Sequence, residues 1–188
     1  MLTVKIYDIG GNDGLRSRLA YPLADITVLD KKTGFDVEQQ EIPRGYYPAD
    51  ILLANHLIEH LWNPDSFLDK CYRAMGNETI LEISTPNLAA WFNRALFVFG
   101  YLPHSYEVSH THNVGKISAW NKEKVGGHIR LFTPYALTQL LKKHALKVID
   151  VQGEYSTYPC NLVIKVIDRV LTLNPNLASA FRIKARKI

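Results

Sequence analysis

A short strand that runs straight into a glycine-rich bend limits the folds open to this chain. Residues 3–7 are apolar and β-branched, which predicts a buried strand, and Asp8 then opens the sequence Asp-Ile-Gly-Gly-Asn-Asp-Gly. A short helix is expected over residues 15–20, because Pro22 closes it. Glycine at such a junction lets the backbone bend sharply and lets a ligand approach without a Cβ in the way. The junction therefore predicts an α/β fold with a nucleotide-like ligand at the bend.

The remaining pattern alternates strands with helices. Further strand-like stretches cover residues 25–29, 35–38, 50–54, 79–84, 146–152 and 180–188. Helices are expected to start at Pro64 and Pro134, with Asn63 and Thr133 as N-caps, and to cover residues 161–173. This order predicts a Rossmann-like, doubly wound, mostly parallel sheet of seven strands with right-handed crossovers. Ligands of such sheets bind outside the carboxyl ends of the strands.

Length and composition indicate one domain, residues 1–188, in a reducing compartment. A chain of 188 residues with 47% hydrophobic content can bury one substantial α/β core. The net charge of +4 is modest, and the basic residues are interleaved with acidic ones, so a nucleic-acid partner is not expected. Cys71 and Cys160 are far apart and form no zinc or redox motif. Without a signal-peptide pattern or a membrane-length apolar run, a cytoplasmic protein is expected, and a homodimer is possible.

Residues 88–127 interrupt the alternation and are interpreted as an insertion after the fifth strand that acts as a lid or binds substrate. The stretch from Trp91 to Phe99 is aromatic and amphipathic, which favours lid core over a membrane anchor, although both readings remain open. His110 and His112 lack a third ligand at characteristic spacing, so no metal site is expected.

The acidic residue beside the bend narrows the class of ligand that can bind there. Asp8 lies two residues before Gly10, and a carboxylate there disfavours a pyrophosphate and favours a cationic or amine-bearing ligand. S-adenosylmethionine carries both a sulfonium and an α-amino group. A dinucleotide fingerprint needs a third glycine in a register that this chain lacks, which counts against the rival reading of a nicotinamide-dependent oxidoreductase or epimerase.

These residues resemble the first loop of the class I S-adenosylmethionine-dependent methyltransferases of the small-molecule type (methyltransferase type 11/23-like). That loop runs Asp-x-Gly-x-Gly-x-Gly, so Asp8, Gly10 and Gly14 match, while Asn12 takes the place of the middle glycine. Asn tolerates a left-handed backbone better than most residues, so the turn can survive. The resemblance implies S-adenosylmethionine as the cofactor, with Gly11 in the same turn. It also implies that Asp30, which ends the second strand, holds the ribose hydroxyls.

The resemblance continues through most of the chain. Residues 50–64 resemble the family's fourth strand and its Glu-His signature, here Glu59 and His60. Residues 84–87 resemble the end of the fifth strand, residues 127–133 the return from the insertion, and residues 185–187 the last, antiparallel strand. The family's acidic segment maps to Glu38 or Gln39 near the adenine amine. The resemblance also implies cofactor contacts from Asn55 and His56.

The implied reaction is methyl transfer to the oxygen or nitrogen of a small molecule by in-line displacement. A hydroxyl acceptor needs a base, and histidine titrates near neutral pH. Our candidates are His128, then His56, then His60, with His104 as a further possibility. Whether Glu59 and His60 steady their loop or contact the methionine end of the cofactor stays open.

A second hypothesis is a non-catalytic, methyltransferase-like binding subunit. Asn12 replaces a family glycine, and family members usually carry a helical extension before the first strand, which here begins at once. Both differences favour lost cofactor affinity, and binding of S-adenosylmethionine separates the two hypotheses.

Overall fold

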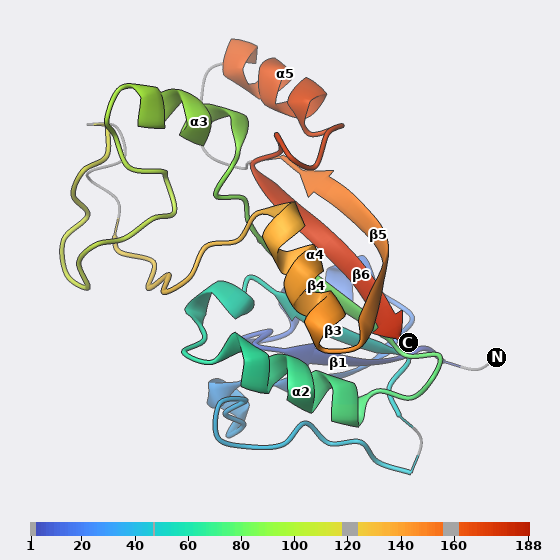
Figure 1. Cartoon of the computed structure of the whole chain (residues 1–188). Helices are drawn as coiled ribbons and strands as arrows, with labels where there is room; N and C mark the ends of the chain where they lie inside the picture. Colours follow the sequence, from blue (N-terminus) through green and yellow to red (C-terminus); the bar gives the residue numbers. More distant parts are fainter. Residues whose placement is uncertain (1–2, 47, 118–123, 156–161) are drawn as a thin grey trace.

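The computed structural model describes residues 3–46, 48–117, 124–155 and 162–188 and contains a mixed sheet of six strands with helices around it (Figure 1). The strands are β1 (Lys5–Ile9), β2 (Asp25–Leu29), β3 (Ile51–Asn55), β4 (Ile80–Pro86), β5 (Leu146–Glu154) and β6 (Ala180–Lys187). The α-helices are α1 (Leu15–Ala20), α2 (Pro64–Ala74), α3 (Trp91–Val98), α4 (Pro134–Lys143) and α5 (Leu162–Leu171), and two 3-10 turns, η1 (Lys31–Thr33) and η2 (Ile58–His60), follow β2 and β3.

The strand order in the sheet is β2-β1-β3-β4-β6-β5. β1 pairs in parallel with β2 and β3, and β3 pairs in parallel with β4. β6 runs antiparallel to both β4 and β5, which confirms the expected antiparallel last strand. The carboxyl ends of β1, β2 and β3 consequently meet at one edge, where the glycine bend leaves β1.

The strand predicted at residues 35–38 is wrong, and the sheet of the described residues has six strands where seven were expected. Asp30 caps η1, and Gly34 closes that turn with φ 85°, so the chain leaves the strand direction before Phe35. Asp36 then donates its backbone N–H to the Gln40 side chain at 2.6 Å and does not join a sheet ladder. Phe35 and Val37 still pack on the core, and apolar residues two positions apart mimic a strand in the sequence.

One sheet face and two helices make the core. α2 begins as its sequence predicts, because the Asn63 side chain accepts the Ser66 backbone N–H at 2.9 Å and Pro64 occupies the first turn. α4 begins in the same way at Thr133 and Pro134. The buried cluster joins Tyr7, Ile9, Leu52, Ala54, Leu81 and Ile83 of the sheet to Phe67, Leu68, Cys71 and Met75 near α2 and to Leu137 and Leu141 of α4.

One of the two cysteines lies among the described residues. Cys71 is a free thiol at 0% exposure, and burial raises its pKa. Cys160 lies outside the described residues.

Across the described ranges, every helix is too short or too polar to cross a bilayer.

The chain between β4 and α4 leaves the sheet and returns to the same point. Asn87 forms an isolated parallel bridge with Phe132, and the Leu88 backbone N–H donates to the Phe132 carbonyl at 2.9 Å. α3 opens this excursion. The last part of the excursion, residues 126–132, passes beside the loop that follows β3. The backbone N–H groups of Ile129 and Arg130 both donate to the Glu59 carbonyl there.

Candidate functional site

The bend after β1 has the left-handed backbone that its composition predicts. Gly10, Asn12 and Gly14 have φ of 72°, 58° and 74°. Asn12 therefore takes up the conformation that a glycine would adopt, as expected for asparagine. A Cβ on Gly10 would lie 2.7 Å from Leu57 Cδ1, so the backbone there passes close to the loop after β3.

Asp8 lies buried beneath the bend. It is 2% exposed, and its Oδ2 accepts a hydrogen bond from Ser17 Oγ at 2.6 Å. Its Oδ1 has no hydrogen-bond partner within the described part of the chain. Burial raises the pKa of Asp8, the Ser17 bond opposes this, and the charge of Asp30 adds to it. A Cβ on Gly11 would overlap the Asp8 carboxylate, so the backbone approaches this acid as only glycine allows.

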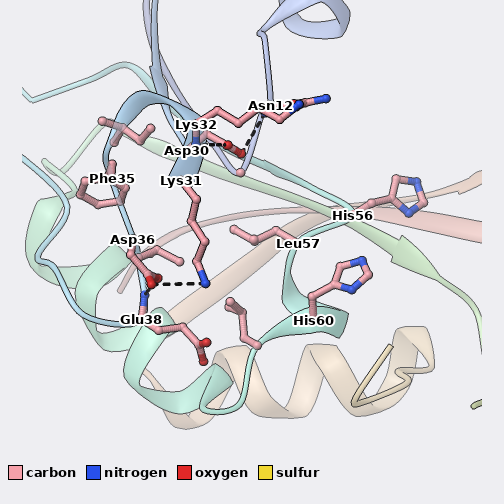
Figure 2. A pocket seen from close by; sticks show the side chains of 14 residues that line it. Asn12, Asp30, Lys31, Lys32, Phe35, Asp36, Glu38, His56, Leu57 and His60 are labelled. Carbon is pink, nitrogen blue, oxygen red and sulfur yellow. Dashed lines mark hydrogen bonds and ion pairs between the residues drawn. The ribbon is translucent and has the colours of Figure 1, made fainter. Parts of the chain in front are cut away.

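Asp30 joins the bend to the end of β2. Its Oδ2 accepts the Asn12 backbone N–H at 3.0 Å, and its Oδ1 accepts the Lys32 backbone N–H at 2.9 Å (Figure 2). Thr33 Oγ1 accepts the Asp30 N–H in return, which completes a capping box. The carboxylate of Asp30, which lines the cavity next to the bend, is thus fixed in place.

A cavity of about 430 Å³ opens beside these groups, as Figure 2 shows. Its apolar lining residues are Leu29, Phe35, Val37, Leu57 and Leu61, and the other residues that line it are Gly10, Asn12, Asp30, Lys31, Lys32, Asp36, Glu38, His56 and His60. The lining therefore offers apolar contacts to a flat ring and polar contacts to hydroxyl and amine groups.

The structure brings together six of the residues singled out in the sequence: Gly10, Asn12, Asp30, Glu38, His56 and His60 line the cavity. Of the two adenine candidates, Glu38 lines it, with Oε1 accepting the Trp62 backbone N–H at 2.7 Å, whereas Gln39 is exposed and outside the lining. Asp8, Gly11 and Gly14 form the bend behind the lining. Asn55 instead accepts a hydrogen bond from Ser84 Oγ at 3.0 Å at the strand ends.

Lys31, Lys32, Phe35 and Asp36 also line the cavity, and the sequence analysis missed them. Lys31 Nζ and Asp36 Oδ2 form an ion pair at 3.2 Å. The missed signal is the spacing of Asp30 and Thr33, which is that of a helix N-cap and predicts a turn where a strand was expected.

Glu59 steadies the loops around the site. Its carboxylate is fully buried, with Oε1 3.2 Å from His56 Nδ1 and Oε2 accepting from Thr85 Oγ1 at 2.9 Å. Its carbonyl accepts the N–H groups of Ile129 and Arg130. One residue therefore ties the loop after β3 to β4 and to the returning chain, and these contacts favour the loop-steadying reading of Glu59.

His60, which lines the cavity, forms a stacked pair with His128. Their ring centroids are 4.9 Å apart with planes 27° from parallel. His60 Nδ1 lies 3.0 Å from the Gly127 carbonyl, so the turn at Gly127 fixes the His60 ring. His128 is not itself among the residues that line the cavity.

Glu107, from the middle of the excursion, holds the chain at His128. Its carboxylate accepts the backbone N–H groups of Gly126, Gly127 and His128 at 2.6, 2.8 and 3.0 Å, and lies 3.6 Å from His128 Nδ1. Burial opposes ionisation of Glu107, but these three bonds and His128 outweigh it and lower its pKa. Burial also lowers the pKa of His128, His60 adds to the effect, and Glu107 and Glu59 oppose it. Sequence reasoning did not find Glu107.

The other histidines lie apart from the cavity lining. His104 is buried with its N–H bonded to Asn93 Oδ1 at 3.0 Å, and His112 Nδ1 lies 2.7 Å from Thr111 Oγ1. Glu59, His60 and His128 place one ligand atom each within 4.8 Å of one another, a spacing compatible with a shared metal ion. Both Glu59 oxygens already bind other side chains, so this cluster lacks a ready carboxylate ligand.

Solved structures of similar fold include methyltransferases. One is a possible histamine N-methyltransferase from Thermotoga maritima, with 14% identity, a TM-score of 0.59 and coverage of 100% of this chain and 84% of that one. Another, from Archaeoglobus fulgidus, is a SAM-dependent methyltransferase with 17% identity, a TM-score of 0.53 and coverage of 98% and 86%. No curated protein matches the sequence.

A third similar structure is an O-methyltransferase from neocarzinostatin biosynthesis, bound to S-adenosyl-L-homocysteine and 1,4-dihydroxy-2-naphthoic acid. It has 13% identity and a TM-score of 0.54; the alignment covers 98% of this chain but 49% of that protein, so this chain spans about half its length. At such identities the likeness concerns the fold.

The sequence itself matches the family model of the methyltransferase domain over residues 5–151. With that match over most of its length, the chain belongs to the class I S-adenosylmethionine-dependent methyltransferases.

Proposed function

We propose that this chain transfers the methyl group of S-adenosylmethionine to the oxygen or nitrogen of a small molecule. The observation that carries the proposal is the bend over Asp8, whose buried Oδ1 has no partner among the described residues, beside a cavity that Asp30 helps to line. A buried carboxylate with a spare acceptor favours a cationic ligand. S-adenosylmethionine supplies such a charge and an activated methyl group.

The lining divides the work of binding this cofactor. In the proposal Asp30 accepts the ribose hydroxyls, for which its oxygens keep further lone pairs. The Glu38 carboxylate accepts a hydrogen bond from the adenine amine, while Phe35 and Leu57 contact the adenine ring. Gly10, Asn12 and His56 border the methionine end.

The remaining predicted residues shape this site from behind the lining. Gly11 and Gly14 set the path of the bend, and Asn55 fixes the end of β3 through Ser84. Gln39 lies beside Glu38 on the exposed side of the chain.

His128 is our first candidate for the base, followed by His56 and His60. Its lowered pKa keeps the imidazole neutral near pH 7, so it can accept a proton. S-adenosylmethionine held by the cavity residues would supply the methyl group and would leave as S-adenosylhomocysteine, and His128 would take the proton that the acceptor oxygen or nitrogen loses. Glu107 acts as a positioning residue, because it holds the backbone of residues 126–128.

Similar structures support a small acceptor without choosing its reactive atom. One is an O-methyltransferase crystallised with a dihydroxynaphthoic acid, and another is a possible histamine N-methyltransferase. The modest, dispersed charge of the chain argues against a nucleic-acid acceptor.

Calorimetry with S-adenosylhomocysteine tests the cofactor part of the proposal. We expect binding in the micromolar range, and a loss of roughly tenfold or more in Asp30→Ala, because a charge-assisted hydrogen bond contributes about 1.5–3 kcal/mol. Asp25→Ala is the matched control, since Asp25 is the exposed acid at the other end of β2. Absence of binding to the unmodified protein would instead support a non-catalytic subunit, and binding of NAD in its place would support an oxidoreductase.

The pH dependence of kcat/KM tests the roles of His128 and Glu107. His128→Gln should abolish the acid limb of the profile for a hydroxyl acceptor. Glu107→Gln removes a charge that raises the pKa of His128, so the acid limb should move to lower pH. If Glu107→Gln lowers the rate but leaves the acid limb at the same pH, Glu107 has only a structural role.

A further inference from the structure

Helix α5 turns its apolar side chains outward. Of residues 162–170, Asp168 alone is buried; the rest of that stretch is exposed, including Leu162 at 76% and Val170 at 60%. Leu162, Val166 and Val170 recur every four residues and share one side of the helix, whereas Asp168 falls half a turn away. Asp168 Oδ1 accepts Trp91 Nε1–H at 2.9 Å and Ser179 Oγ–H at 2.6 Å. A polar side chain thus anchors this helix, and its apolar stripe faces outward.

Helix α3 repeats this arrangement next to it. Its buried residue is Asn93, which donates to the carbonyls of residues 87 and 88 and accepts the His104 N–H. Phe97, Val98 and Phe99 are exposed at 54%, 82% and 77%, so the lid-core expectation is wrong for this end of the helix. The Trp91–Asp168 bond joins the two helices, which lie together at one end of the molecule (Figure 1). We name their exposed apolar side chains the end face: Phe97, Val98, Phe99, Leu162, Val163, Ile164, Val166, Ile167 and Val170.

The exposed charged side chains on these two helices are all basic. α3 carries Arg94, and α5 carries Lys165 and Arg169, all three exposed. The single acid of the two helices is Asp168, which is buried between Trp91 and Ser179. An apolar surface with exposed cations and without an exposed acid on either helix complements an anionic lipid bilayer, where apolar side chains enter the interface and cations meet the headgroups.

We propose that the end face docks the protein on the surface of an anionic membrane. α3 and α5 lie in the interface with their apolar side chains in the acyl boundary, and the rest of the protein stays in water. This docking goes beyond methyl transfer and does not depend on it, because none of the end-face residues lines the cofactor cavity.

Flotation with lipid vesicles tests the docking. The full chain is mixed with vesicles of phosphatidylcholine, with or without phosphatidylglycerol. We expect it to float with the anionic vesicles roughly tenfold more than with the neutral ones. Raising the salt from about 0.05 to about 0.5 M should release much of it, because headgroup attraction is screened. Absence of flotation with anionic vesicles, or equal flotation with neutral ones, would overturn the proposal.

Matched substitutions localise the contact. Leu162→Asp should lose most of the flotation, and Val98→Asp should do the same from α3. Leu23→Asp is the control, because Leu23 is 89% exposed between α1 and β2 and lies outside the end face. Circular dichroism checks that each variant is folded. Equal flotation of all three variants would overturn the proposal. A stable dimer that Leu162→Asp dissociates would also overturn it, since the end face would then be a subunit interface.

Discussion

Replacing Gly11 by alanine tests the bend over Asp8 most sharply. The new Cβ would overlap the Asp8 carboxylate, which is 2% exposed and bonded to Ser17 Oγ. The carboxylate must therefore move and lose this bond. A buried polar group left without its partner costs about 1–3 kcal/mol, which for a chain of this size lowers Tm by roughly 2–10 °C.

A double-mutant cycle separates this cause from general strain in the loop. In an Asp8→Ala background the carboxylate is absent, so Gly11→Ala should cost less than about 1 kcal/mol, because contacting residues are non-additive. The assay is urea unfolding of the four proteins, followed by calorimetry with S-adenosylhomocysteine. Equal costs of Gly11→Ala in both backgrounds would refute the proposed contact, as would unchanged ligand affinity in Gly11→Ala alone.

Three further predictions concern stability. Asn12→Val should destabilise the protein by about 1–2 kcal/mol in thermal unfolding, because a β-branched residue resists φ of 58°, whereas Asn12→Gly should not. His144 is bonded to Asp69 and Asp65 at 2.7 and 3.0 Å, which outweighs burial and raises its pKa. Its stabilisation of about 0.5–1 kcal/mol is therefore full below pH ~6.5 and lost as pH rises through the raised folded pKa, and His144→Gln should flatten that slope in urea unfolding. Cys71→Ser should lower the free energy of unfolding by about 1–3 kcal/mol, because it buries a hydroxyl group, and Cys71→Ala should lower it less.

Sequence reasoning succeeded where local chemistry and periodicity agree. Asn63 with Pro64 begins α2, Thr133 with Pro134 begins α4, and the bend at residues 8–14 has the backbone its composition requires. In each case the determining contacts lie within a few residues of one another, so the sequence displays them directly.

It failed where a local cap was overlooked and where distant contacts decide. The alternation at residues 35–38 predicts a strand, but the Asp30 cap and Gly34 turn the chain away before it can pair. Glu107 is held by N–H groups about twenty residues away, and backbone donors leave no pattern in a sequence. The apolar stripe of α5 gives the same periodicity whether it faces a core or the outside, and the anchoring of Asp168 decides between them.

A crystal structure with S-adenosylhomocysteine is the most direct measurement of how this methyltransferase holds its cofactor. We predict the ribose hydroxyls on the Asp30 carboxylate, the adenine between Phe35 and Leu57, and the methionine end against the bend at Gly10. Density for the ligand elsewhere, or an empty cavity at saturating ligand, would contradict the account.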